Sequence, residues 1–129
     1  MKPLHFIGSS FKDLRDFPDD VRQEVGYSLY LSQIGGKAIN TVPMVGFGGA
    51  KVLEVVIDDD GDTYRAIYTV KFVHAIYALH AFQKKSKKGN ETPKPDMKLI
   101  RERLKVAENH HNTTYKSRLR KEKANGRGA

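Results

Sequence analysis

One stretch constrains this chain more than any other: residues 74–88 read His-Ala-Ile-Tyr-Ala-Leu-His-Ala-Phe-Gln-Lys-Lys-Ser-Lys-Lys. Its first part, residues 74–82, is apolar and short, which is typical of a strand that is buried on both faces. Its second part, residues 84–88, holds four lysines in five residues, and so much like charge needs water or an anion around it. We therefore expect a buried strand that delivers His80 and a cationic cluster to one edge of a sheet.

The composition indicates one soluble domain. The chain has 129 residues, which is long enough to bury a core that needs no covalent cross-links or metal ions for stability. It has no cysteine, so neither disulfides nor thiolate metal sites are possible. It has no apolar run of the ~18 residues that a membrane span needs, and its start does not resemble a signal peptide. We expect a cytoplasmic protein that does not bind a membrane.

The charge is concentrated in the last third of the chain. Residues 1–82 hold 8 Lys/Arg and 10 Asp/Glu, whereas residues 83–129 hold 15 and 5. This asymmetry favours a polyanionic partner, RNA or DNA ahead of a membrane surface, although a merely solubilising tail would look the same. It also predicts two parts: a folded domain over residues 1–108 and a basic, partly disordered tail over residues 109–129.

The order of the expected elements indicates an α+β fold. A short strand over residues 4–8 precedes two helices that meet at Pro18, and Gly35-Gly36 ends the second helix. Residues 42–47, 51–58, 63–70 and 74–82 are then expected to be strands, and the last three, which are close in sequence, are expected to form an antiparallel meander. A basic helix that opens at Pro95-Asp96 follows an irregular loop. The aspartate-rich residues 58–62 read as a turn between strands, because a calcium loop of the EF-hand type needs flanking helices.

Arg65 is the first candidate site residue because it lies in the middle of a strand. A buried arginine is costly unless it meets a carboxylate, and Glu54 on the neighbouring strand is the structural partner to expect. The functional interpretation is equally open, since a planar guanidinium can grip a phosphate at two points. The two interpretations are compatible.

His80 is the second candidate. With a period of two, it shares a face with Ile76, Ala78 and Phe82, opposite Tyr77 and Leu79. A lone histidine in an apolar strand is usually a satisfied core residue. Its place near the strand end, beside lysines, would also suit a general base that activates a hydroxyl.

The lysines themselves are the third feature: Lys84, Lys85, Lys87 and Lys88. A lysine run alone usually marks a solvated loop. Next to Arg65 and His80 it would form a cradle for a phosphodiester and its charged transition state. We expect no metal site, since the adjacent His110 and His111 would point apart on a helix.

Several sequence pieces, in this order, resemble the phage-derived HigB/RelE-like toxins of bacterial type II toxin–antitoxin modules. The resemblance covers roughly residues 4 to 107. The matching pieces are Asp13-Leu14, Phe17-Pro18, Val21-Arg22, Gly26, Leu29, Gly46-Phe47-Gly48, Leu53-Glu54-Val55, Gly61-Asp62, Tyr64-Arg65, Tyr68, Leu79-His80-Ala81-Phe82-Gln83-Lys84-Lys85-Ser86, Thr92-Pro93, Arg101 and Leu104.

The resemblance implies a RelE-like fold: a twisted antiparallel sheet with two N-terminal helices packed on it and a C-terminal helix. It also implies an endoribonuclease that cuts mRNA on the ribosome, without metal or other cofactor, and that a helix-turn-helix antitoxin neutralises. In such enzymes the 2′-hydroxyl of the RNA attacks the adjacent phosphate. Arg65 would then stabilise the phosphate, His80 would transfer protons, and Lys84 and Lys85 would bind phosphate. Lys87, Lys88 and Arg101 would add RNA-binding charge.

The chain departs from the resemblance at three places. After Leu53-Glu54-Val55 the family commonly has an arginine, and here the residue is Val56. Gly89-Asn90-Glu91 lengthens the loop before Thr92, and the basic segment beyond residue 108 goes past the usual end. A catalytically inactive homologue that still binds RNA or its antitoxin is therefore the competing hypothesis. A toxin of the same fold that inhibits DNA gyrase is a third, which the lysine-rich strand end disfavours.

Overall fold

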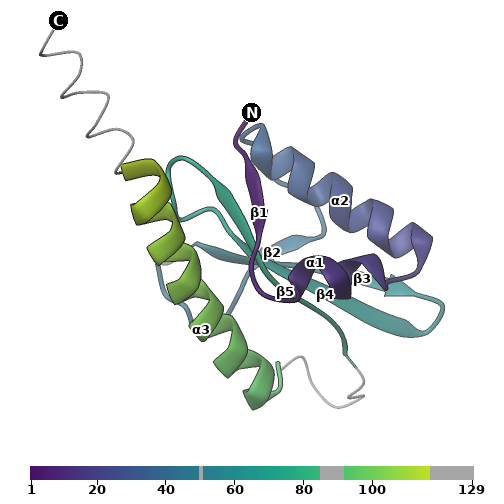
Figure 1. The fold of residues 1–129 in the computed structure, drawn as a ribbon. Helices are drawn as coiled ribbons and strands as arrows, with labels where there is room; N and C mark the ends of the chain where they lie inside the picture. The colour runs from purple at the N-terminus through teal and green to yellow at the C-terminus, as the bar shows by residue number, and fades with distance from the viewer. Residues whose placement is uncertain (50, 85–91, 117–129) are drawn as a thin grey trace, which may run out of the picture.

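The computed structural model describes residues 1–49, 51–84 and 92–116. A five-stranded sheet lies between two helical layers (Figure 1). Along the chain the elements are β1 (Leu4–Phe6), α1 (Ser10–Arg15), α2 (Asp19–Gln33), β2 (Thr41–Pro43), β3 (Val52–Asp59), β4 (Asp62–Thr69), β5 (Ile76–Lys84), α3 (Lys94–His111) and a closing π-helical turn (Asn112–Lys116).

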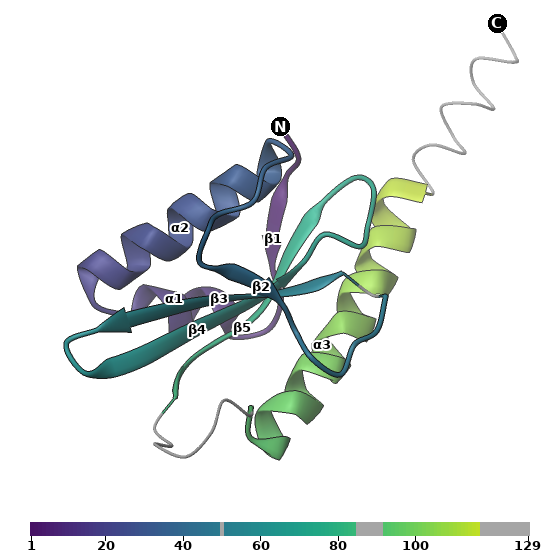
Figure 2. The same cartoon turned by 180° about the vertical axis from the view of Figure 1, so that it is seen from behind.

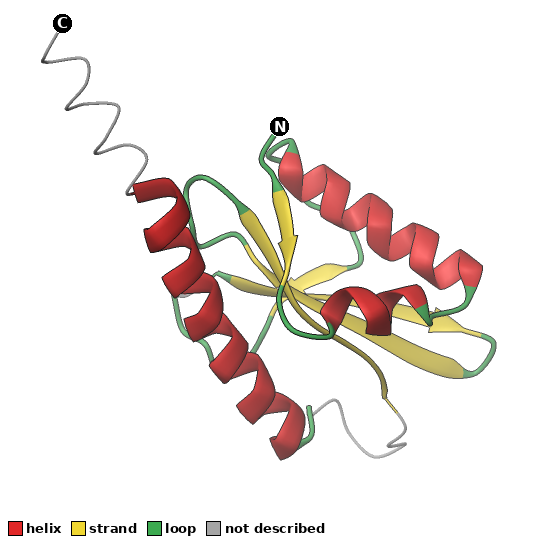
Figure 3. Ribbon diagram, viewed as in Figure 1, coloured by secondary structure: helices red, strands yellow, loops and turns green. Residues whose placement is uncertain are grey.

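The sheet has the order β1-β5-β4-β3-β2. The β3, β4 and β5 strands pair antiparallel, which confirms the predicted meander. Strand β2 also pairs antiparallel with β3, and β1 adds to the far edge parallel to β5. Helices α1 and α2 cover one face and α3 covers the other (Figure 3), as the view from behind also shows (Figure 2). The predicted α+β, RelE-like architecture is confirmed.

The helical hairpin forms for the expected reasons. Pro18 stands immediately before α2 in an extended conformation, and Asp19 and Asp20 place negative charge in the first turn. At the other end, Gly35 adopts a left-handed φ of 88°, and the amide of Gly36 donates to the carbonyl of Leu31 at 2.7 Å. This closing turn needs a residue without a Cβ.

Each face of the sheet has its own core. Val21, Val25 and Leu29 of α2 pack with one set of strand residues. On the opposite face, Ile100 and Ala107 of α3 pack on Tyr77 and Leu79 of β5. Within the described residues, none of the helices combines the length and apolar character needed to cross a bilayer.

The β5 strand differs from its prediction in two ways. It runs through Lys84, whose exposed fraction is only 9%, so our expectation that this lysine lies outside the buried strand is wrong. The strand also contains a β-bulge, because Ile67 pairs with His80 whereas the next residue, Tyr68, pairs with Ala78. Leu79 is the extra residue, and the bulge interrupts the alternation of faces.

The bulge corrects the predicted orientation of His80. This side chain stacks on Phe82, with ring centroids 4.9 Å apart, as a shared face requires. However, it contacts Asp96 and Arg103 of α3, on the face of Tyr77 and Leu79 rather than that of Ile76. A strict period of two fails here because Leu79 and His80 are consecutive residues that face the same side.

Candidate active site

Arg65 lies in the middle of β4, directly opposite Val56 on β3 and Phe82 on β5. Its Nη1 donates to Oε1 of Glu54 at 2.5 Å, and both side chains are more than nine-tenths buried. The ion pair expected from the sequence is thus present. The two residues lie diagonally across adjacent strands, a separation that long side chains bridge readily.

Lys84 adds a second cation on the same face. Burial raises the pKa of Glu54, and the nearby positive charges of Arg65 and Lys84 act in the opposite direction. One buried carboxylate is therefore flanked by two buried cations. Such a cluster has an excess positive charge that an anion can balance.

A cavity of about 670 Å³ opens over Glu54 and Arg65, and Lys84 is not among the residues that line it. Glu54, Val56 and Arg65 line it from the sheet, the segment from Val42 to Gly46 forms one side, and Thr92 and Met97 line it near the start of α3. The cavity therefore gives a ligand access to the guanidinium of Arg65. It also exposes Val56 at the position where the resemblance leads us to expect an arginine.

His80 is held by α3 rather than presented to this cavity. Its Nε2 lies 2.7 Å from Oδ1 of Asp96, its Nδ1 lies 3.5 Å from Nη1 of Arg103, and 8% of the residue is exposed. The structure thus brings Arg65 and Lys84 together around Glu54 and places His80 farther along β5, in contact with α3. Both imidazole nitrogens face α3 side chains in this arrangement.

Arg101 lies beside the cavity and is exposed. Its Nη2 donates to the carbonyl of Gly46 at 3.1 Å, and its guanidinium lies 4.8 Å from the ring centroid of Phe47. These contacts hold the 46–47 segment against α3 while leaving the charge at the surface. Lys85, Lys87 and Lys88, which are also candidate site residues, lie outside the described residues.

A comparison with protein families identifies the family to which the chain belongs. The sequence model of the family described as phage derived protein Gp49-like (DUF891) matches residues 12–105. The chain belongs to this Gp49-like family. Its members are associated with toxin–antitoxin modules and are related to RelE/HigB-like toxins. Searches of the curated proteins and of the solved structures found no match.

Two residues that sequence reasoning did not assign to the site emerge in this Gp49-like chain. Asp96 was predicted only to open a helix, and Arg103 was assigned no role. Arg103 donates to the carbonyl of Leu79 and to Oγ of Ser9, both at 2.9 Å, so it joins α3 to β5 and to the start of α1. No local signal could have revealed contacts with residues 16 to 94 positions away.

The residues that were rejected as metal ligands have hydrogen-bond partners within the protein. Nδ1 of His110 lies 2.7 Å from the hydroxyl of Tyr77, and Nε2 of His111 accepts from the backbone amide of His74 at 3.3 Å. Asp58 accepts a hydrogen bond from Oγ1 of Thr63 at 2.8 Å. Across residues 1–49, 51–84 and 92–116, there is no cluster of three or more histidine or acidic side chains that could hold a metal ion.

Proposed function

We propose that this Gp49-like chain is the toxin of a type II toxin–antitoxin module and cleaves mRNA on the ribosome. The observation that supports this most is the pair of buried cations, Arg65 and Lys84, around one carboxylate at an open cavity. A phosphodiester is the anion that such a cluster fits best, because a guanidinium and an ammonium can share its oxygens. Lys85, Lys87, Lys88 and Arg101 extend the positive charge that contacts the RNA backbone.

In the proposed reaction, the 2′-hydroxyl of the RNA loses its proton and attacks the adjacent phosphorus. The P–O5′ bond breaks, leaving a 2′,3′-cyclic phosphate and a 5′-hydroxyl that takes up a proton. Arg65 and Lys84 stabilise the negative charge on the phosphorane-like transition state. His80 transfers a proton, after the RNA or a shift of α3 has freed one of its nitrogens from Asp96 or Arg103.

A specific observation favours Glu54 as a second candidate for the group that takes the 2′-hydroxyl proton. Glu54 lines the cavity next to Arg65, and burial raises the pKa of its carboxylate. A carboxylate with a raised pKa is a stronger base than one in water. The two assignments differ in the pH dependence of cleavage. A general base must be deprotonated and therefore produces the acidic limb, where the rate rises with pH. Loss of this limb in Glu54→Gln supports Glu54, and its retention there supports His80.

The decisive experiment is induced expression of the chain, with growth and mRNA integrity followed over time. Growth arrest with cut mRNA is the expected result, and intact mRNA with normal growth would contradict the nuclease proposal. We then expect Arg65→Ala and His80→Ala each to slow cleavage by ~10²-fold or more. Arg22→Ala is the matched control, because Arg22 is an exposed arginine on α2, away from the cavity.

Two further measurements keep the site assignment testable. Thermal melting of each variant separates lost chemistry from lost folding, and Arg65→Lys retains a charge where Arg65→Ala leaves Glu54 without its partner. Unchanged cleavage in both Arg65→Ala and His80→Ala would refute the assignment. A protein that binds RNA with normal affinity and never cuts it would support the alternative, an inactive homologue, which the presence of Val56 favours.

A further inference from the structure

Helix α2 has an apolar side that no other part of the described chain covers. Tyr27, Tyr30 and Ile34 follow one another at positions i, i+3 and i+7, and their exposed fractions are 61%, 46% and 53%. The opposite side of the same helix supplies the buried residues of the core. A surface helix normally turns a polar side to water, so a second apolar stripe indicates a contact that is made with another molecule.

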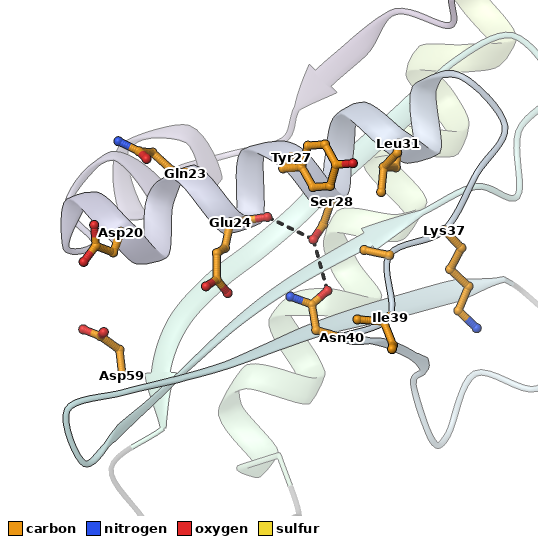
Figure 4. Close-up of a pocket in the computed structure, with 11 residues that line it drawn as sticks. Asp20, Gln23, Glu24, Tyr27, Ser28, Leu31, Lys37, Ile39, Asn40 and Asp59 are labelled. Carbon is orange, nitrogen blue, oxygen red and sulfur yellow. Dashed lines mark hydrogen bonds between the residues drawn. The ribbon is translucent and has the colours of Figure 1, made fainter.

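This side of α2 borders a groove of about 760 Å³ (Figure 4). Tyr27, Ser28 and Leu31 form the helix wall, and Lys37 to Asn40 forms the other wall. Oγ of Ser28 donates to the carbonyl of Glu24 at 3.0 Å and lies 3.2 Å from Oδ1 of Asn40, so a side-chain contact links the two walls. Because this contact links the two walls, the groove is formed without a bound partner. Ile39 is fully exposed at the groove.

The charge of the groove is opposite to that of the molecule. Asp20, Glu24 and Asp59 lie at one end, and Lys37 is the one basic residue among its lining residues. The whole chain has a net charge of +8. Phosphates are repelled from three carboxylates, so RNA is a poor occupant, whereas lysine and arginine side chains are attracted to them.

The neighbouring sheet edge indicates the conformation of the occupant. Strand β2 forms one of the two edges of the sheet, and an extended peptide could in principle add to it. However, Pro43 removes one backbone donor from this strand of three residues, which weakens pairing with a further strand. An amphipathic helix laid into the groove satisfies its own backbone and needs only apolar and charged side chains.

We propose that the groove between α2 and residues 37–40 docks an amphipathic, cationic helix from a protein partner. Its apolar side chains would contact Tyr27, Leu31 and Ile39, and its lysines or arginines would face Asp20 and Glu24. Residues 37–40 of the groove lead along the chain into the segment from Val42 to Gly46, which lines the cavity that contains Arg65. The docking itself does not depend on nuclease activity.

A displayed library of random peptides, several helical turns long, tests this proposal on the full-length chain. We expect selection to enrich peptides with leucine, isoleucine or phenylalanine at helical spacing and with lysine or arginine on one flank. The double variant Tyr27→Ser, Ile39→Ser should weaken an enriched peptide by ~10-fold or more, because exposed apolar anchors dominate such interfaces. The double variant Asp20→Asn, Glu24→Gln should weaken it roughly 5-fold and reduce its salt dependence.

Matched controls come from the same chain. Val73→Ser removes an exposed apolar side chain elsewhere, and Glu102→Gln removes an exposed carboxylate on α3; neither change should alter the peptide affinity. Enrichment of acidic peptides, or equal binding by the groove variants, would overturn the proposal. If deleting residues 117–129 strengthens peptide binding at the groove, the basic end of this chain is the natural occupant, and a protein partner is refuted.

Discussion

Glu54, Arg65 and Lys84 together set the electrostatics of the candidate site. Moving one carboxylate and two cations out of water is costly, and the raised pKa of Glu54 shows that burial outweighs the two neighbouring positive charges. An arrangement that is costly for the free protein becomes favourable when an anion enters and shares the cations. Val56 faces Arg65 across the β3–β4 ladder and lines the same cavity.

We expect Val56→Arg to increase RNA cleavage by about 10-fold or more, because it adds a third cation at the wall of the cavity. The extra like charge next to Arg65 should also lower the free energy of unfolding by about 1–3 kcal/mol. Cleavage of a labelled RNA on programmed ribosomes and urea unfolding measure the two effects.

Val56→Gln is the matched control for size and polarity without charge. It should lower stability to a similar extent but leave cleavage unchanged. Equal cleavage by the wild type and Val56→Arg would show that the missing arginine does not limit activity.

The residues of the site were only partly predictable. The Arg65–Glu54 pair follows from strand alternation, because residues on one face of adjacent strands must meet. Lys84 was assigned to solvent on the rule that clustered lysines stay exposed, and that rule failed because a carboxylate on β3 was available. The Asp96 contact of His80 depends on where α3 crosses the sheet, and no local pattern encodes that crossing.

At the scale of elements, Arg103 fastens α3 to the rest of the molecule. Its guanidinium reaches β5 and the Ser9 hydroxyl, and it packs against Gly8, where an added Cβ would come within 2.8 Å of Nε. Gly8 also has a left-handed φ of 58°. The close approach of α3 to the β1–α1 corner therefore requires glycine at this position.

We expect Arg103→Gln to lower the free energy of unfolding by about 1–3 kcal/mol, because it leaves the carbonyl of Leu79 and the Ser9 hydroxyl without a charged donor. Urea unfolding followed by circular dichroism measures this loss. Lys105→Gln, on the exposed side of the same helix, should change stability by less than ~0.5 kcal/mol. Equal effects of the two substitutions would contradict the fastening role of Arg103.

Aromatic and histidine side chains at the C-terminal end of α3 form a second set of contacts that hold this helix in place. Nε2 of His5 on β1 lies 2.6 Å from the hydroxyl of Tyr115, and its ring lies 4.7 Å from that of His110. Burial lowers the pKa of His5 below its usual 6.5, and the nearby charge of His110 lowers it further. The folded protein thus favours the neutral form of His5, which is also stacked on Tyr77.

Because the pKa of His5 is lowered in the folded protein, the free energy of unfolding depends on pH. The stability that His5 contributes is present above about pH 6.5 and is lost as the pH falls through its lowered folded pKa. We expect the free energy of unfolding to drop between about pH 7 and about pH 5, and to drop less in His5→Phe, which keeps the ring but cannot be protonated. Parallel pH profiles for the two proteins would show that His5 does not contribute.

Some element boundaries are set by residues nearby in the chain, and others are set by contacts with distant residues. The hairpin of α1 and α2 was predictable because Pro18 and Gly35 act within a few residues of the chain. The bulge in β5 was not, because Leu79 and His80 resemble any alternating pair until β4 imposes the register. A histidine that sequence periodicity assigns to the α1–α2 face consequently lies under α3.

At the scale of the whole molecule, the positive charge beyond α3 should control how RNA binding responds to salt. The tail was predicted from residue 109, but α3 and its closing turn continue to Lys116, and residues 117–129 lie outside the described residues. Residues 117–129 contain five Lys/Arg and one Glu. Deleting them leaves His110, His111 and Tyr115 in place.

We expect this deletion to weaken RNA binding and to reduce the salt slope by roughly 0.7 for each lost cation that contacts a phosphate. Fluorescence anisotropy with a labelled RNA at several salt concentrations measures the slope. A chain with glutamine at the five basic positions separates charge from length and should behave like the deletion. An unchanged slope in both proteins would show that the tail only aids solubility.

The parallel pairing of β1 with β5 has a consequence for synthesis. Leu4 is made long before its partner in the sheet, Ile76. During translation β1 therefore has no strand to pair with until the chain has been extended past that residue. Lys84 ends the same late strand, so the sheet closes and the cations meet in one late stage of folding. A product that stops before β5 would carry neither a complete sheet nor a candidate site.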